Sequence, residues 1–322
     1  MSSTNNSVPE KTEALYQGFI NMLVEGKVSD VSDLITQILN KRNNMDLSEK
    51  ISQVDTLKKW LDSFRPLSYE IVEELKKQYD VKFTYNSNAI EGNTLTQSET
   101  ELVIEKGITV GGKQLSEHLE AIGHKEAIDY IESLSRKEQP ITLREIKDIH
   151  NVIMRGISIE EAGRYRQLDV RAAGTGHTYP AHFLVSGLMD EFVDWMNSQE
   201  AKSLHPLKLA TEVHYRFVSI HPFKDGNGRT ARLLMNLSLL RSGYPIVIID
   251  NQKRSEYINS LVFAQDNHDN TDELFGMILD GSEESLIDYL KISSTAAASQ
   301  GKGELFYEEV QNYLDKLTVS EK

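Results

Sequence analysis

Several features are missing from this chain of 322 residues. It has no cysteine, which excludes disulfide bonds, thiolate zinc sites and a cysteine nucleophile, and fits a reducing compartment. No apolar run approaches the roughly 18 residues that a membrane-spanning helix needs. The longest candidate is the short segment Pro245–Ile249. The polar N-terminus contains no apolar signal-peptide core. We therefore expect a cytosolic protein without a membrane segment.

Positive charge is also in short supply. The chain carries 35 lysine and arginine residues against 49 aspartate and glutamate residues, for a net charge of -14. Binding to nucleic acid without regard to sequence needs a basic surface, so we expect no nucleic-acid partner. With 39% hydrophobic and 26% charged residues, the composition is that of an ordinary globular protein with one or two domains.

The spacing of apolar residues is that of helices along most of the chain. Before residue 80 it predicts four helices, at Thr12–Val24, Val31–Leu39, Ile51–Phe64 and Ile71–Tyr79. Thr96 with Glu99, and Thr142 with Glu145, have the spacing of a capping box that opens a helix. Further helices are predicted at Leu115–Leu134, Leu204–Ser219, Leu233–Leu240, Arg254–Gln265 and Glu304–Leu317. The predicted fold class is therefore mainly α.

The most informative stretch is His221–Arg232, which reads HPFKDGNGRTAR. Its glycines shortly precede the apolar helix predicted at Leu233–Leu240 and so lie at a helix N-terminus. Free backbone N–H groups and the positive end of the helix dipole make such a place an anion site. Gly226 and Gly228 let the backbone approach a phosphate closely, because they have no Cβ.

The charged side chains of this stretch fit the same ligand. Arg229 and Arg232 are three residues apart, on nearly the same face of the first helical turn, where two guanidinium groups suit a polyphosphate. Asp225 among these cations is explained by a Mg²⁺ ion that joins its carboxylate to phosphate oxygens. His221 stands at the entrance of the loop, where it can act as a general base.

This stretch resembles the Fic family motif HPF-x-[DE]-GNGR-x-x-R, with every fixed position filled. Most proteins with this pattern transfer AMP from ATP to a protein hydroxyl. The resemblance implies that His221 deprotonates the target hydroxyl, that Asp225 holds Mg²⁺ on the α- and β-phosphates, and that Phe223 anchors the loop in the core. It further implies an anion hole at Gly226, Asn227 and Gly228, with Arg229 on the β-phosphate and Arg232 on the γ-phosphate.

A second segment, Ser87–Asn93, reads SNAIEGN and is similar to the autoinhibitory motif [ST]-x-x-x-E-[GN] of the family. It lies well before the catalytic loop, as in the Fic class with an N-terminal inhibitory helix. By this resemblance, Glu91 pairs with Arg232 and takes the place of the γ-phosphate, so that ATP binds with its α-phosphate turned wrongly for attack. The similarity runs from about residue 84 to residue 294.

The resemblance also implies an architecture. We expect a Fic-type helical bundle with a small β-hairpin, the flap, between Arg164 and Pro180, which holds a target segment by strand pairing. Tyr257 and Gln265 are our candidates for lining the adenine pocket. The predicted domains are an N-terminal helical region at 1–80, a catalytic domain at 81–295 with the inhibitory helix near 84–92, and a linker with a helix at 296–322.

The predicted function is a Mg²⁺-dependent protein adenylyltransferase, autoinhibited by Glu91, that acts with ATP on a target protein. The sequence does not identify the target, which could be the protein itself. It is also compatible with a homodimer. A kinase-like Fic protein is one alternative, which Gly228 and Arg229 disfavour because that branch has GNK at this place. The others are removal of AMP from a target, with Glu91 orienting water, and a non-catalytic nucleotide-binding regulator. The presence of His221 and Asp225 disfavours the last.

Overall fold

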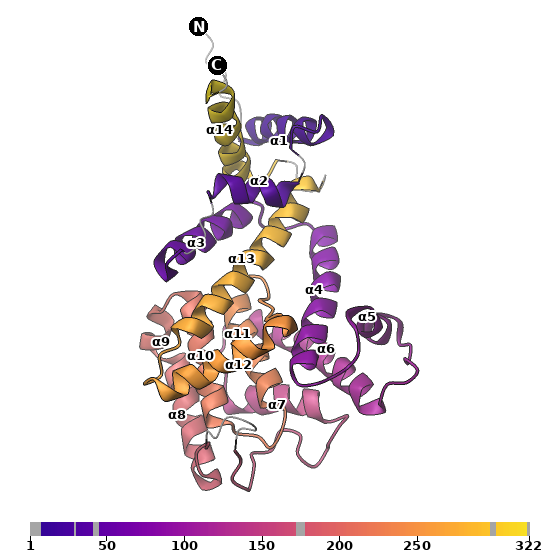
Figure 1. Cartoon of the computed structure of the whole chain (residues 1–322), viewed down its shortest axis with the longest axis vertical. Coiled ribbons are helices and arrows are strands. Elements are labelled where there is room, and N and C mark those ends of the chain that lie inside the picture. Colours follow the sequence, from indigo (N-terminus) through magenta and orange to yellow (C-terminus); the bar gives the residue numbers. More distant parts are fainter. Residues whose placement is uncertain (1–7, 29, 41–44, 172–177, 297–300, 321–322) are drawn as a thin grey trace. The chain divides into compact units, whose positions relative to one another are not determined.

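The computed structural model describes residues 8–28, 30–40, 45–171, 178–296 and 301–320. These residues are mostly helical, and the only pairing of extended segments among them is an isolated antiparallel bridge between Arg171 and Thr178 (Figure 1). The prediction of a mainly α fold is confirmed. The tip of the predicted flap, residues 172–177, lies outside the described residues. Within the described ranges, no helix is both long and apolar enough to cross a membrane.

The chain divides into two compact units, of which the first comprises Met1–Lys77 and Ser282–Lys322. It contains the helices α1 (Val8–Val24), α2 (Val31–Ile38), α3 (Leu47–Ser63) and α14 (Glu304–Ser320). Helix α14 packs against the other three. Six aromatic rings in mutual contact form the centre of this packing, from Tyr16, Phe19, Trp60, Phe64, Phe306 and Tyr307. Two long helices, α4 (Tyr69–Ile90) and α13 (Asp272–Thr295), have residues in both units.

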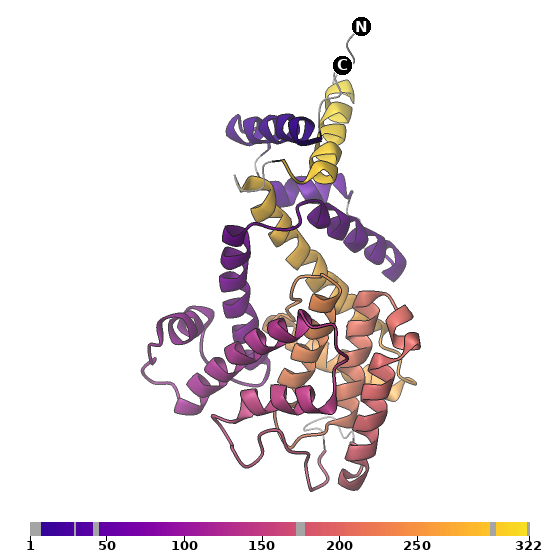
Figure 2. The same cartoon turned by 180° about the vertical axis from the view of Figure 1, so that it is seen from behind.

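The second unit, Gln78–Gly281, is built around one buried helix. Helix α11 (Asn227–Arg241) packs against α6 (Leu115–Ser135), α7 (Leu143–Met154) and α10 (Pro206–Ile220), as the two opposite views in Figures 1 and 2 show. Neighbours on several sides leave most of its residues buried, the two arginines of its first turn included. The remaining helices are α5 (Gln97–Lys106), α8 (Val185–Asn197), α9 (Gln199–Ser203) and α12 (Arg254–Asp266).

Local sequence signals account for most helix boundaries. The capping boxes predicted at Thr96 and Thr142 are both formed, and Gly107 ends α5 with φ of 63°. The helix predicted at Ile71–Tyr79 is longer, because α4 continues to Ile90 through a polar stretch that includes Asn86 and Ser87. Such residues favour helices weakly, but tertiary contacts offset this preference. The Asn86 side chain, for example, accepts the backbone N–H of Asn251 at 2.9 Å.

Candidate active site

The loop between α10 and α11 is braced from inside. Phe223 is fully buried, as expected, and its ring stacks on that of His150 with 3.6 Å between centroids and 7° between planes. The side chain of Asn227 closes the loop, since its Oδ1 accepts the N–H of Phe223 and its Nδ2 donates to the Phe223 carbonyl, both at 2.9 Å. These contacts fix the path of the backbone between the candidate base and the first turn of α11.

His150 supports the same loop from α7. Its Nε2 lies 2.9 Å from the carbonyl oxygen of Asp225, and its Nδ1 accepts the backbone N–H of Gly163 at 2.9 Å. Gly226 has φ of 76°, and a Cβ there would lie 3.0 Å from the Sδ of Met154 and 3.2 Å from Nε2 of His150. Glycine is therefore required at this position both for its backbone conformation and for the closeness of α7.

The predicted base, His221, ends α10 in a left-handed conformation with φ of 50°. The ring of Tyr179 stacks on its imidazole, with 4.0 Å between centroids and 19° between planes. Burial lowers the pKa of His221 to about 4, so the imidazole is uncharged at neutral pH and can accept a proton.

The predicted contact between the two motifs is present. Arg232 is 1% exposed, and its Nη2 donates to Oε1 of Glu91 at 2.7 Å. The same guanidinium donates to the hydroxyl of Ser87 at 3.0 Å and to the Ser87 carbonyl at 2.8 Å. Its Nη1 lies 3.4 Å from the hydroxyl of Tyr257, which lies 2.8 Å from Nε2 of the buried His214. The end of α4 thus occupies most of the hydrogen-bonding capacity of this arginine.

Glu91 also lies directly on the first turn of α11. A Cβ added to Gly228 would lie 2.2 Å from Oε1 of Glu91, closer than atoms that are not bonded can come. The missing side chain of Gly228 therefore makes the space for the carboxylate. An anionic group at a helix N-terminus, paired with an arginine, is also what a bound phosphate would be.

Arg229, one residue after Gly228, is in a different situation. It is 2% exposed, yet its Nε and Nη1 have no hydrogen-bond partner among the described residues. Its nearest acidic groups are Glu120 and Asp225, each at 3.7 Å, and its Nη2 lies 3.7 Å from the Sδ of Met154. A buried guanidinium with unsatisfied donors is costly, which indicates a position made for an anionic ligand.

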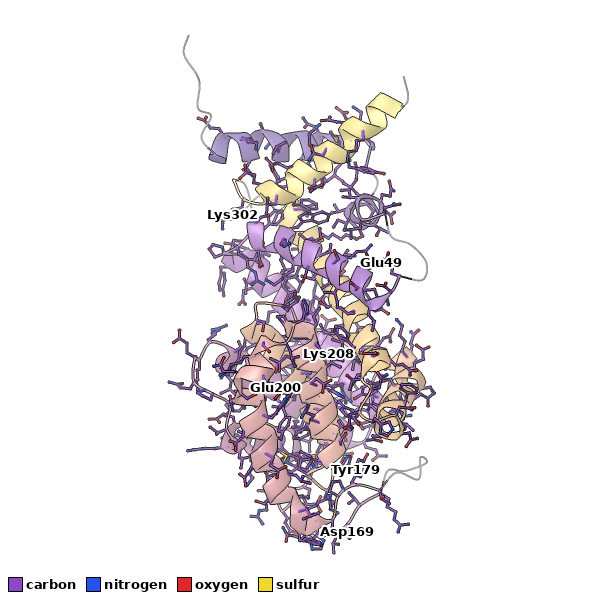
Figure 3. The ribbon with its side chains drawn as sticks, turned by 90° about the vertical axis from the view of Figure 1, so that its left-hand side faces the viewer. Glu49, Asp169, Tyr179, Glu200, Lys208 and Lys302 are labelled. Atoms are coloured by element: carbon purple, nitrogen blue, oxygen red, sulfur yellow. The ribbon has the colours of Figure 1, made fainter. Side chains whose placement is uncertain are left out.

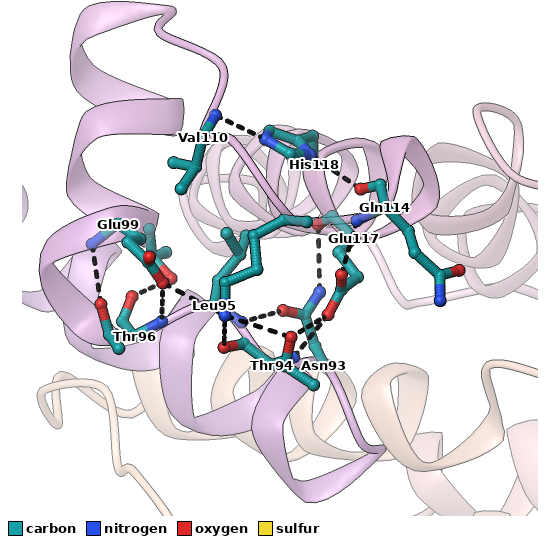
Figure 4. A network of polar contacts seen from close by, with 11 residues as sticks. Asn93, Thr94, Leu95, Thr96, Glu99, Val110, Gln114, Glu117 and His118 are labelled. Carbon is teal, nitrogen blue, oxygen red and sulfur yellow. Dashed lines mark hydrogen bonds and ion pairs between the residues drawn. The ribbon is translucent and has the colours of Figure 1, made fainter.

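The segment after Glu91 is fastened to α6 (Figure 4). The carboxylate of Glu117 accepts the N–H and the hydroxyl of Thr94, both at 2.7 Å, and the N–H of Gln114 at 2.8 Å. The side chain of Asn93 donates to the Glu117 carbonyl at 3.0 Å and to the carboxylate of Glu120 at 2.8 Å. Glu91 is therefore held by fixed structure on both of its sides, α4 before it and this network after it.

A cavity of about 400 Å³ connects these parts of the site. Six residues predicted from the sequence line it, namely Glu91, His221, Gly228, Arg232, Tyr257 and Gln265. Arg171, Tyr179, Val218, Arg254, Ile258, Leu261 and Val262 complete the lining. Asp225, Gly226, Asn227 and Arg229 belong to the adjoining loop and first helical turn. Tyr257 faces the cavity, but its hydroxyl points to Arg232, a contact that its predicted role beside adenine did not include.

Four residues of the site have roles that the sequence analysis did not predict. They are His150 and Arg166, which hold the loop, Tyr179, which stacks on the base, and His214, which bonds Tyr257. The contact of His214 with Tyr257 connects it through that hydroxyl to Arg232. Each of the four acts through contacts between segments far apart in the chain, and the sequence does not display these contacts.

A buried helix with two buried arginines in its first turn and an uncharged histidine just before it is a helical site suited to an anion. Comparison with known proteins makes this assignment specific. The profile of the Fic/DOC family matches residues 140–239. The crystal structure of a Fic domain-containing signalling protein from Bacteroides thetaiotaomicron superposes with a TM-score of 0.66 at 31% identity, over 77% of this chain and 98% of that chain. The chain belongs to the Fic/DOC family.

Curated relatives extend the comparison. The chain is 36% identical over 260 residues to the protein adenylyltransferase Fic of Drosophila grimshawi, over 81% of this chain and 51% of the relative. It is 41% identical over 221 residues to the protein of that name from Nematostella vectensis, over 68% and 51% respectively. The structure of Fic-1 from C. elegans has a TM-score of 0.66 at 28% identity, with 90% of this chain and 88% of that chain covered. The chain spans about half the length of the curated relatives it matches.

Proposed function

We propose that this chain is a protein adenylyltransferase, which transfers AMP from ATP to a hydroxyl side chain of a target protein and releases pyrophosphate. The observation that carries the proposal is the place of Glu91. Its carboxylate lies over the first turn of α11 against Gly228, paired with Arg232, in the cavity that His221 lines. A phosphate chain in that position would have its reacting end beside the base. Relatives with the name protein adenylyltransferase Fic support the same reaction.

The residues divide the reaction between them. The N–H groups at Asn227 and Gly228 and the guanidinium groups of Arg229 and Arg232 would hold the phosphates, whereas the N–H of Gly226, predicted to join them, donates to Asp225 in this structure. His221 takes the proton of the target hydroxyl while the hydroxyl oxygen attacks the α-phosphorus. The bond from the α-phosphorus to the oxygen that bridges to the β-phosphate breaks, and pyrophosphate leaves with that oxygen. Such a reaction depends on positioning and on neutralising charge, which these groups supply.

Asp225 fits the role of a Mg²⁺ ligand. Its side chain is 64% exposed, and one oxygen accepts the N–H of Gly226 at 2.6 Å. A single accessible carboxylate suits Mg²⁺, which keeps several waters and takes its remaining ligands from phosphate oxygens. When bound, the ion would neutralise charge on the phosphates and orient them. Asp225 would hold it beside Arg229, whose guanidinium lies 3.7 Å from the carboxylate.

Glu91 would inhibit this activity. Its contact with Arg232 removes the partner of the γ-phosphate and fills the space over Gly228, so nucleotide would bind without the orientation that attack requires. We also propose how the adenine base and the target protein are bound. Tyr257 and Gln265 would lie beside adenine, the flap would hold a segment of the target by strand pairing, and the target could be a second copy of this chain in a homodimer.

The test uses the Glu91→Gly variant with ATP labelled at either the α- or the γ-phosphate, a cell lysate and Mg²⁺. Label from α-labelled ATP should enter protein, and label from γ-labelled ATP should not. The reverse pattern would indicate a kinase-like phosphotransferase. Release of AMP from a previously modified protein, without new labelling, would indicate the reverse activity. Binding of ATP with neither reaction would leave a nucleotide-binding regulator.

A further inference from the structure

Two segments meet beside the candidate base, at residues 164–171 and 178–184, and the second ends in the short 3-10 helix His182–Leu184. An antiparallel bridge joins Arg171 to Thr178. The carboxylate of Asp169 accepts the backbone N–H of His182 at 2.8 Å and lies 3.0 Å from its Nδ1. Asp169 and Tyr179, one from each segment, are labelled in Figure 3. The first segment leads away from α7, and the second carries the ring that covers His221.

One arginine binds both segments and the base together. The side chain of Arg166 is 1% exposed, its hydrogen bonds to described residues go to backbone carbonyls, and its Nη1 lies 3.9 Å from the carboxylate of Asp169. Its Nε donates to His221 at 2.9 Å, its Nη1 to Leu168 at 3.1 Å, and its Nη2 to Pro180. Its own backbone N–H donates to Pro222 at 3.0 Å. Hydrogen bonds to a charged donor are roughly twice as strong as neutral ones, so this is a firm connection.

The backbone of His221 needs such support. A left-handed conformation is strained for a residue with a Cβ, and it persists only where neighbouring contacts impose it. Arg166 donates to the carbonyl of His221 itself. It also donates to the carbonyl of Pro180, the residue after Tyr179, whose ring stacks on the imidazole. The main chain of the base and the ring that stacks on it are therefore fixed by the same guanidinium.

We propose that Arg166 and Tyr179 are positioning residues for the base of the proposed reaction, Arg166 through the main chain of His221 and Tyr179 through the face of its imidazole. The inference rests on the proposed function. Glu91, Asp225 and the guanidinium of Arg166 are the charged groups that act on this imidazole, and the ring of Tyr179 shields one face of it from water. Removing the ring admits water and frees the imidazole to turn away from the hydroxyl.

The variants are made in the Glu91→Gly protein. Tyr179→Ala should lower kcat for AMP transfer about 10- to 100-fold, the order of loss that a displacement of about 1 Å produces. Tyr179→Phe keeps the ring and should restore most of that rate. Arg166→Lys cannot reach three carbonyls at once and should lower kcat at least as much as Tyr179→Ala. Phe183→Ala is the matched control, because Phe183 lies on the same segment and is 74% exposed.

Binding and titration separate positioning from damage to the fold. The affinity for a non-hydrolysable ATP analogue should change less than about threefold in all variants, since neither Arg166 nor Tyr179 is among the groups proposed to bind the phosphates. NMR titration of His221 should show its pKa rising in Tyr179→Ala and returning with Tyr179→Phe, whether or not AMP transfer occurs. An unchanged titration together with an unchanged kcat in Tyr179→Ala would overturn the inference. An inactive Glu91→Gly parent that still shows the pKa shift would instead count against the proposed function alone.

Discussion

The two arginines at the start of α11 are equally buried but differently satisfied. Arg232 is bonded to Ser87, Glu91 and Tyr257, so its charge has partners in the protein alone. Arg229 keeps two nitrogens without a hydrogen-bond partner among the described residues. Under the proposed function, the segment around Glu91 would take the place of a ligand at Arg232 and would leave Arg229 without one. A nucleotide would thus find Arg229 with free hydrogen-bond donors and Arg232 already bonded to Glu91, on the same helical turn.

The largest effect is expected at His221. The two arginines are proposed to bind phosphate, whereas His221 is proposed to take the proton, so its loss should affect the reaction and not ATP binding. In the Glu91→Gly background, His221→Ala should lower AMP transfer about 10²- to 10⁴-fold, the usual contribution of a general base. The dissociation constant for ATP should stay nearly unchanged. Transfer is measured with α-labelled ATP and binding by calorimetry. Labelling at the parental rate would show that another group takes the proton.

The comparison itself predicts stability changes of opposite sign. Arg232→Met should destabilise the ligand-free protein by about 2–3 kcal/mol, because it breaks charge-assisted bonds inside the protein. Glu91 is 39% exposed and can be rehydrated, which keeps the loss below that of a fully buried pair. Arg229→Met removes a buried guanidinium that has two nitrogens without hydrogen bonds and only long ion pairs, of 3.7 Å, with Glu120 and Asp225, and it should be neutral or stabilising by about 1 kcal/mol. Urea unfolding without nucleotide measures both variants, and equal losses would contradict the comparison.

Removing the Glu91 carboxylate should leave Arg232 available to bind a phosphate. A charge-assisted hydrogen bond contributes roughly 1.5–3 kcal/mol, so Glu91→Gly should raise the rate of AMP transfer about 10- to 100-fold. Glu91→Gln is the matched control, because it keeps the size of the side chain and loses its charge, and it should give an intermediate rate. The same rate in wild type and Glu91→Gly, across ATP concentrations, would reduce Glu91 to the end of a helix.

The smallest effect is one of pH. His221 acts as a base only when it is unprotonated, and its lowered pKa of about 4 keeps it so under mildly acidic conditions. The kcat of the Glu91→Gly variant should therefore change less than about twofold between pH 7 and pH 5.5, and fall as the pH passes through about 4. Circular dichroism must show that the protein stays folded in this range. A midpoint near 6.5 would mean that the base is exposed to water when it reacts.

Much of this structure was predictable because its signals are local. The capping boxes at Thr96 and Thr142 are fixed by neighbours within four residues, and both formed as predicted. The catalytic loop was likewise visible as one continuous stretch. The pairing of Glu91 with Arg232 spans the chain, and only the resemblance to Fic motifs could predict it.

The supports of the site had no such signal. Arg166 reads as an ordinary arginine, and the tyrosine at 179 as one polar aromatic among many in a loop. Their roles depend on which carbonyl groups and rings the fold brings to them. Helix α4 joins the helix predicted at Ile71–Tyr79 to the inhibitory helix predicted near 84–92, and Asn251 and Arg232 bind the side chains of its polar residues Asn86 and Ser87.

Gly228 sets a limit on how this protein can change. Its absent side chain leaves the volume that the Glu91 carboxylate fills, and the proposed phosphate would need the same volume. A larger residue there would expel the inhibitor and the nucleotide together. A laboratory selection for unregulated variants should therefore return substitutions in the segment around Glu91 and its attachments to α6, and none at position 228. Under the proposed function, inhibition could be lost through many substitutions around Glu91, but not through a substitution of Gly228, the residue that Glu91 covers.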